Sequence, residues 1–200
     1  MNAEQFITAF VDVIMITGIL ILFGFLMHLV SNVIFNMLAS VFGDGAALFV
    51  VNRLTFIGVM HHELSHALLA FVSGAKVHEI SLFKPSGTEL GHVKISYRGN
   101  VLLKALQSCL AAYAPVICGT MTSLVLIQIL QKQDLQLWAR ILLLFLLISI
   151  ILHEDLSKRD IMNGLKGLPI IMGAMFVIFL VSGLDIRADM IKLFSNIQKM

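Results

Sequence analysis

Charged residues are scarce in this chain. Aspartate, glutamate, lysine and arginine make up 13% of its 200 residues, whereas a soluble globular domain carries about a quarter. Hydrophobic residues reach 58%, and the mean hydropathy is +0.94. This balance excludes an ordinary soluble domain and predicts a polytopic membrane protein in contact with the lipid bilayer.

Cysteine is also rare, with only Cys109 and Cys118 present. The two lie nine residues apart in one apolar segment, which puts them on roughly opposite faces of a helix. They cannot pair within that helix, and they lack the C-x-x-C spacing of a cysteine metal site. We expect both to be small packing residues.

The chain has no continuous basic patch, and its net charge is only +2. Its basic residues lie in short segments between apolar runs, so no nucleic-acid partner is expected. The first apolar run lacks the basic start and the cleavage site of a signal peptide, which predicts a retained span. No stretch is long enough for a separate soluble domain, and residues 1–200 are predicted to form one membrane-embedded domain.

Five apolar runs approach the roughly 20 residues that cross a bilayer as a helix. The predicted spans are residues 6–30, 46–73, 101–130, 135–152 and 161–184. Asp12 and His28 interrupt the first span near its ends, and we expect their side chains to reach toward water. The semi-polar segment 31–44 is predicted to lie along the membrane surface.

Two other segments follow different patterns. Residues 76–98 alternate like strands around Lys84-Pro85-Ser86-Gly87, which predicts a β-hairpin. Residues 185–200 place Ile186, Met190, Leu193, Phe194 and Ile197 on one face, which predicts an amphipathic interfacial helix. The predicted fold class is an all-α polytopic membrane protein with about five transmembrane helices, this small hairpin and this amphipathic tail.

The second predicted span contains the pattern H-E-x-x-H as His62-Glu63-Leu64-Ser65-His66. Residues four apart lie one helical turn above each other, so the two imidazoles can reach one metal ion. Glu63 is placed to take a proton from a metal-bound water. The alternative is a histidine pair that hydrogen-bonds neighbouring helices. Polar groups in an apolar span favour the functional interpretation.

A catalytic zinc takes three protein ligands and keeps one position open. The polar cluster 153–160 offers four candidates for the third ligand: His153, Glu154, Asp155 and Asp160. Asp160 is best placed, because Ser157 can cap a helix that leads into the fifth span and sets Asp160 in its first turn. Asp160 could instead only complement the helix dipole. His153 could instead hydrogen-bond a metal ligand without binding the metal itself.

The basic residues also predict an orientation. Lysines and arginines surround both the hairpin and the cluster 153–160. With five spans these two segments lie on the same side, which the positive-inside rule makes cytoplasmic. The protein is therefore expected in the cell membrane with its active site toward the cytoplasm.

Residues 46–184 resemble the site-2 protease (M50) family of intramembrane zinc metalloproteases, in particular its small bacterial members without a PDZ domain. Four ordered features carry the resemblance: His62-Glu63-Leu64-Ser65-His66 in a span, a hairpin with Gly91-His92-Val93, Ala114-Pro115 in the next span, and Ser157-x-x-Asp160 before the last span. The resemblance implies one Zn²⁺ per chain held by His62, His66 and a later aspartate, with Glu63 as general base. Many relatives follow that aspartate with glycine, whereas Ile161 follows Asp160 here, and Ala114-Pro115 replaces a glycine-proline or asparagine-proline pair.

The expected function is hydrolysis of peptide bonds in membrane proteins or membrane-associated peptides, by a Glu63-assisted zinc-bound water. The hairpin 76–98 is expected either to bind substrate as an added strand or to be a simple linker. A catalytically inactive M50-like membrane binding or immunity protein is the main alternative. A transporter is less favoured, because no repeats or paired broken helices are evident. A regulatory membrane partner is compatible with either of the first two functions.

Overall fold

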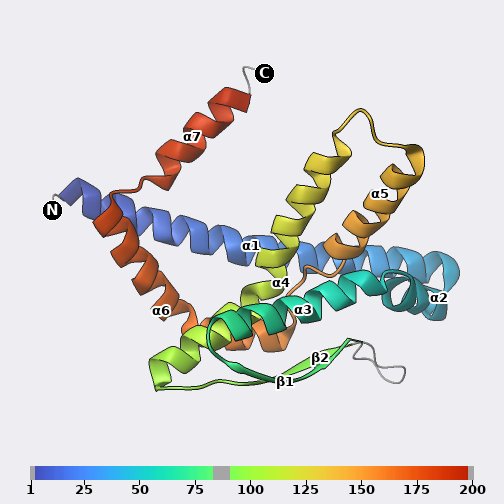
Figure 1. Cartoon of the computed structure of the whole chain (residues 1–200), viewed down its shortest axis with the longest axis horizontal. Coiled ribbons are helices and arrows are strands. Elements are labelled where there is room, and N and C mark those ends of the chain that lie inside the picture. The colour runs from blue at the N-terminus through green and yellow to red at the C-terminus, as the bar shows by residue number, and fades with distance from the viewer. Residues whose placement is uncertain (1–2, 83–90, 198–200) are drawn as a thin grey trace.

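The computed structural model describes residues 3–82 and 91–197. These residues form helices and one two-stranded antiparallel sheet (Figure 1). In chain order the elements are α1 (Ala3–Phe42), α2 (Asp44–Phe49), the π-helical turn η1 (Val50–Leu54), α3 (Phe56–Val72), β1 (Lys76–Ser81), β2 (His92–Ser96), α4 (Val101–Leu130), α5 (Leu137–Ile151), α6 (Lys158–Ser182) and α7 (Ile186–Ile197).

Among the described residues, α1, α4 and α6 are long and apolar enough to cross a membrane. Helices α3 and α5 are shorter apolar helices of 17 and 15 residues. Large apolar side chains such as Leu22, Met121 and Val181 are exposed along the long helices. This exposure is compatible with contact between these helices and lipid. The mostly helical prediction is confirmed, and the expectation of five spans stays a prediction.

The first helix differs from its prediction because α1 continues unbroken past Val30 to Phe42. Its polar residues do not mark an end, since they bind the connection between α5 and α6. The hydroxyl of Ser31 donates to the carbonyl oxygen of Leu152 at 2.9 Å. His28 Nδ1 lies 3.2 Å from Asp155 Oδ2. Residues 31–42 therefore continue the same helix, and their position along the membrane surface stays a prediction.

Asp12 is also placed differently from its prediction. Its side chain is fully buried and does not reach water. Its two carboxylate oxygens accept from Arg187 Nε and from the backbone N–H of Ile186, each at 2.8 Å. Asp12 therefore joins α1 to the start of α7.

The predicted span 46–73 is interrupted between α2 and α3 by η1 and Thr55. The Thr55 hydroxyl donates to the carbonyl of Val51 at 2.7 Å, and its N–H donates five residues back to Val50 at 3.1 Å. Such i→i−5 bonding defines a π turn. The apolar run is one in sequence, but its metal motif lies on the separate helix α3.

The predicted hairpin is present as β1 and β2. They pair antiparallel from Lys76 opposite Ser96 to Ser81 opposite His92, with an irregularity between Val77 and Glu79. The expected turn at 84–87 lies outside the described residues. The sheet packs against α3 and α4 through an apolar cluster: Ala70, Ala75, Ala111, Val77, Ile95 and Tyr97.

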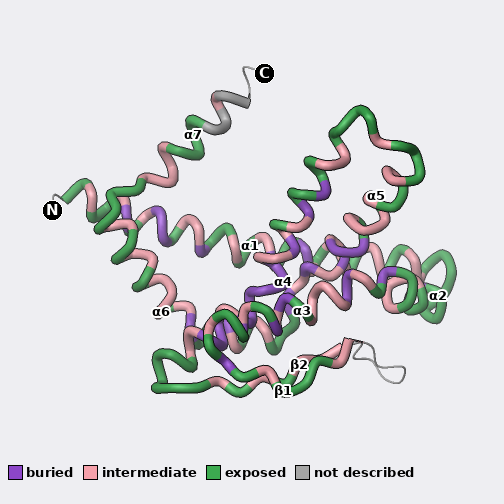
Figure 2. The backbone as a smooth tube through the Cα atoms, viewed as in Figure 1, coloured by how far each residue is buried: buried purple, intermediate pink, exposed green. Residues whose placement is uncertain are grey.

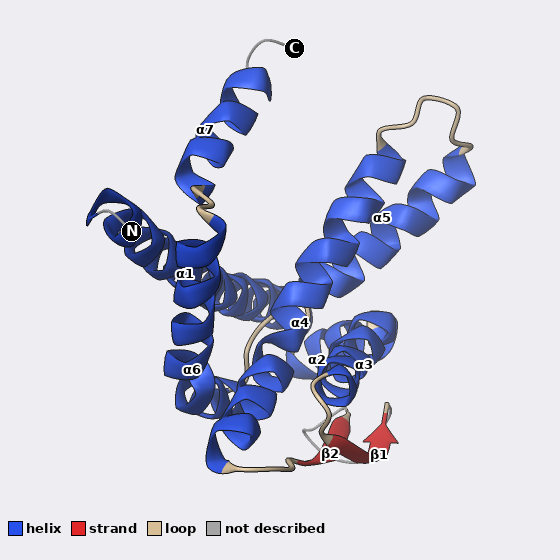
Figure 3. Cartoon of the chain, turned by 60° about the vertical axis from the view of Figure 1, so that its left-hand side comes forward, coloured by secondary structure: helices blue, strands red, loops and turns tan. Residues whose placement is uncertain are grey.

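Helix α4 is the centre of the packing. Buried positions gather around it and α3, whereas the arm formed by the end of α4 and α5 projects outward and is largely exposed (Figures 2 and 3). Helix α6 approaches α4 closely at Gly167, where an added Cβ would lie 2.0 Å from the Ala105 carbonyl oxygen. This close approach brings the start of α6 beside the metal motif.

The last two helices largely follow their predictions. Helix α6 begins at Lys158, earlier than the expected 161, because Ser157 caps it. The predicted amphipathic tail 185–200 contains α7. Residues 198–200 and the side chains of Leu193, Phe194 and Ile197 lie outside the described part, while Ile186 is half-buried and Met190 is exposed.

Candidate metal centre

Two imidazoles of α3 point at each other. His62 and His66 lie one turn apart, and their Nε2 atoms are 3.1 Å from each other. On the far side of each ring, Nδ1 lies 2.6 Å from a backbone carbonyl oxygen, that of His153 for His62 and that of Ala111 for His66. A carbonyl only accepts, so each Nδ1 carries a proton. When both rings are neutral, the Nε2 lone pair of His62 therefore faces the Nε2 lone pair of His66.

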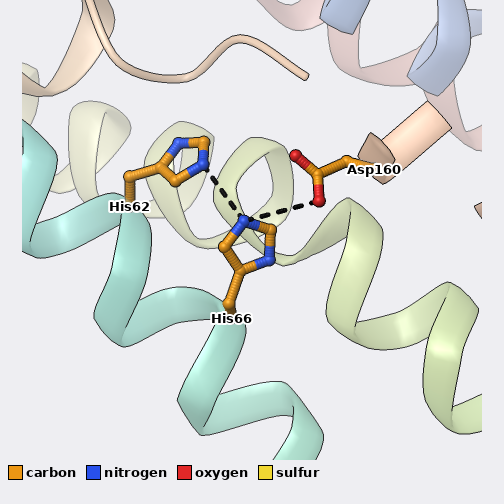
Figure 4. Close-up of side chains that lie close together, drawn as sticks. All are labelled: His62, His66 and Asp160. Carbon is orange, nitrogen blue, oxygen red and sulfur yellow. Dashed lines mark hydrogen bonds and ion pairs between the residues drawn. The ribbon is translucent and has the colours of Figure 1, made fainter. Parts of the chain in front are cut away.

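Asp160 completes this group from the first turn of α6. Ser157 and Asp160 form a capping box, in which Ser157 Oγ accepts from the Asp160 N–H and Asp160 Oδ2 accepts from the Ser157 N–H, both at 3.1 Å. The other carboxylate oxygen, Oδ1, lies 3.7 Å from His66 Nε2. Figure 4 shows the carboxylate directed toward the imidazoles from a separate element.

The donor set fits a zinc ion. The prospective ligand atoms of His62, His66 and Asp160 all lie within 4.8 Å of one another. Tetrahedral zinc with bonds of about 2.05 Å needs ligand atoms roughly 3.3 Å apart, between the 3.1 Å and 3.7 Å found here. Facing lone pairs beside a carboxylate are mutually repulsive without a bound cation or a proton. Two imidazoles and one carboxylate are also a ligand set that zinc uses.

The three residues open onto a cleft of about 740 Å³. Side chains from α3, β2, α4 and the start of α6 line it, together with the α5–α6 connection. Those of His66 and Asp160 are 12% and 13% exposed, so the site is largely shielded from water but opens into this cleft. The arrangement is shielded but accessible, as a catalytic metal site needs to be.

Glu63 lines the same cleft and is held beside β2. A Cβ added at Gly91, directly before the strand, would lie 2.6 Å from Glu63 Cγ and 2.9 Å from the Ser81 carbonyl oxygen. Only glycine at position 91 therefore leaves room for both the Glu63 side chain and the Ser81 carbonyl of β1. Gly91 fixes the space that Glu63 occupies.

Of the four candidates for the third ligand, the structure groups only Asp160 with His62 and His66. Glu154 is buried and accepts from the Ser123 hydroxyl at 2.7 Å. Burial raises the pKa of Glu154, and this hydrogen bond partly opposes the shift. Asp155 lines the cleft but contacts His28. The Nδ1 of His153 donates to the Ser149 carbonyl at 2.8 Å, and its own carbonyl supports His62.

Sequence reasoning missed the carbonyls of Ala111 and His153 as partners of the imidazoles, and it missed the contact between Gly91 and Glu63. Backbone carbonyls carry no residue-type signature, and Gly91 is an ordinary hairpin residue by its pattern. The two carbonyl contacts and the contact between Gly91 and Glu63 all depend on how segments distant in sequence pack together.

Comparisons with known proteins add no further identification. The chain matched no protein-family model, and searches of the curated proteins and of the solved structures gave no match. A function must therefore be argued from the site itself.

Proposed function

We propose that this protein is an intramembrane zinc metalloprotease of the site-2 protease type, with five transmembrane helices and its cleft toward the cytoplasm. The observation that carries the proposal is the meeting of His62 Nε2, His66 Nε2 and Asp160 Oδ1 in a cleft that Glu63 also lines. Lys158 and Arg159 at the same cleft favour the cytoplasmic orientation.

The ligands are His62, His66 and Asp160, and one zinc ion binds per chain. When bound, zinc polarises a peptide carbonyl and increases the acidity of water. Glu63 accepts a proton from the attacking water and passes it to the leaving nitrogen. The carbonyls of His153 and Ala111 keep the two imidazoles oriented during this step.

Strand β2 is the proposed guide for the substrate. Val93 and Ile95 alternate along it, and both line the cleft together with Tyr97, which directly follows the strand. Among the described residues β2 pairs only with β1, so its second edge is open to an added strand. A membrane substrate must unwind locally before water can reach its backbone, and pairing with β2 holds the opened segment extended.

Metal content is the first test. Native protein purified with zinc is expected to hold about one zinc per chain, whereas His66→Ala and Asp160→Ala lose it. A native chain without zinc would reject the proposal and favour a binding or immunity protein on a protease-like scaffold.

Cleavage is the second test, with a labelled single-span model substrate that carries a helix-breaking Gly-Pro pair. Glu63→Gln should keep zinc and abolish cleavage, because the amide cannot accept the proton. Cleavage at the native rate by Glu63→Gln would exclude Glu63 as the base.

A further inference from the structure

One proline interrupts the hydrogen bonding of α4 beside the metal motif. Pro115 lies inside α4 and is fully buried. In a regular helix the N–H of residue 115 would donate to the carbonyl of residue 111. Proline has no N–H, and its ring also crowds the carbonyl four residues back. The carbonyl of Ala111 is therefore left without its helical donor.

That same carbonyl accepts from the imidazole of His66. His66 Nδ1 lies 2.6 Å from the Ala111 carbonyl oxygen, so the bond replaces the helical one that Pro115 removes. The bond places the proton on Nδ1, which leaves Nε2 unprotonated and directed at His62 and Asp160. His62 needs no proline for the same purpose. Its acceptor is the carbonyl of His153, which lies outside the helices, two residues after the last residue of α5, and so is not part of a helical hydrogen-bond ladder.

We propose that Pro115 is a positioning residue for the metal site. By withholding a backbone N–H, it reserves the Ala111 carbonyl for His66 and so fixes the tautomer and orientation of that ligand. The expected effect on zinc binding rests on the proposed zinc site. The tautomer of His66 does not, because it is set by the protein without zinc.

Two substitutions restore the missing donor. Pro115→Ala gives residue 115 an N–H that competes for the Ala111 carbonyl, and Pro115→Val does the same with a side chain closer to proline in volume. Both are expected to weaken zinc binding on the order of tenfold, the lower end of the usual effect of removing a ligand's supporting partner. Affinity is measured by competition with a chromophoric chelator in detergent.

Pro169→Ala is the matched control. Pro169 also lies inside an apolar helix, α6, but the carbonyl four residues before it belongs to Leu165, which does not line the cleft. Its replacement should leave zinc affinity within about twofold of native, since no ligand depends on that carbonyl. An equal loss in Pro169→Ala would assign the effect to general helix straightening and overturn the proposal.

The tautomer readout needs no zinc. In zinc-free protein with ¹⁵N-labelled histidine, the His66 resonance, assigned by its loss in His66→Ala, should report protonation at Nδ1. In Pro115→Ala and Pro115→Val the same resonance should move toward a mixture of tautomers. A native pattern in both folded variants would overturn the role of Pro115, even if the native chain binds no zinc. A shifted tautomer in a chain that binds no zinc would instead support the role of Pro115 and reject only the proposed function.

Discussion

Two groups of polar side chains join segments that are distant in sequence, and they differ in how their donors and acceptors are matched. At the junction of α1 and α7, the carboxylate of Asp12 accepts from the guanidinium of Arg187 and from a backbone N–H. At the metal motif, His62, His66 and Asp160 turn acceptor atoms toward one point. In the first group each carboxylate oxygen accepts from a donor within the protein. In the second group a bound cation or a proton is needed to remove the repulsion between the acceptor atoms.

This difference separates a structural joint from a candidate site. Burying a polar group is costly unless it is paired, so a paired carboxylate such as Asp12 is explained by stability. The convergence of the acceptor atoms of His62, His66 and Asp160 has no such explanation, which is why we propose a metal site there. The two groups should accordingly respond in opposite ways to substitution.

The largest expected effect is on zinc binding when a converging acceptor is neutralised. Asp160→Asn should weaken zinc binding by about 100-fold or more, because a charged ligand becomes a poor neutral one. Glu154→Gln should change it less than threefold, since Glu154 faces Ser123 and does not line the cleft. Chelator competition on both variants checks this pair. A loss of zinc in Glu154→Gln with none in Asp160→Asn would move the third ligand to Glu154.

The matched group should show the opposite response. Asp12→Ala should lower the free energy of unfolding by about 2 kcal/mol, less than for a fully buried ion pair because Arg187 is 38% exposed and can turn to water. Its zinc content should remain native. Unfolding by sodium dodecyl sulfate in mixed micelles measures the stability change. Metal loss in this variant at unchanged stability would contradict the separation of the two groups.

Gly91 tests whether Glu63 depends on its neighbour. Gly91→Ala should lower kcat about tenfold, or roughly 1.4 kcal/mol of barrier, because the new methyl displaces the Glu63 side chain. Zinc affinity should not change. Gly173→Ala is the control, since an added Cβ there meets nothing within 4 Å among the described residues. Unchanged kcat in Gly91→Ala would exclude the role given to this contact.

The smallest expected effect concerns the cap that holds Asp160. Ser157→Ala should cost about 1 kcal/mol of stability and weaken zinc binding severalfold, since the Asp160 carboxylate loses the Ser157 hydroxyl as a donor and keeps only the backbone N–H of residue 157. Asn100→Ala removes the cap of α4, where Asn100 accepts from the Leu103 N–H at 2.9 Å. Its stability loss should be similar, with zinc affinity unchanged. Equal zinc affinities in the two variants would show that the Ser157 cap does not position the carboxylate.

Local patterns in the sequence predicted much of this architecture. Hydropathy located the apolar helices, period-two alternation located the hairpin, and helix α4 has its predicted bounds of 101 and 130. The spacing of His62 and His66 placed both on one helix face, and Ser157 predicted the cap that sets Asp160 in the first turn of α6. These predictions depend on residues close in sequence.

The errors arose where distant segments meet. The semi-polar segment that begins at Ser31 suggested the end of a span, but the Ser31 hydroxyl donates to the Leu152 carbonyl from within one long helix. Asp12 suggested a residue reaching water, yet its partner Arg187 lies 175 residues away. Pro115 lies in a predicted span, but nothing local to α4 could show that His66 would use the carbonyl that this proline leaves without a donor. Tertiary partners decide such cases, and one sequence does not state them.

The length of α1 has a consequence for the surrounding lipid. A helix of 40 residues is about 60 Å long, twice the roughly 30 Å of a bilayer's hydrocarbon core. In a membrane, α1 must incline steeply, leave the hydrocarbon before its end, or thicken the bilayer around it. His28 ties α1 to Asp155 at the cleft, so this adjustment occurs next to the candidate site.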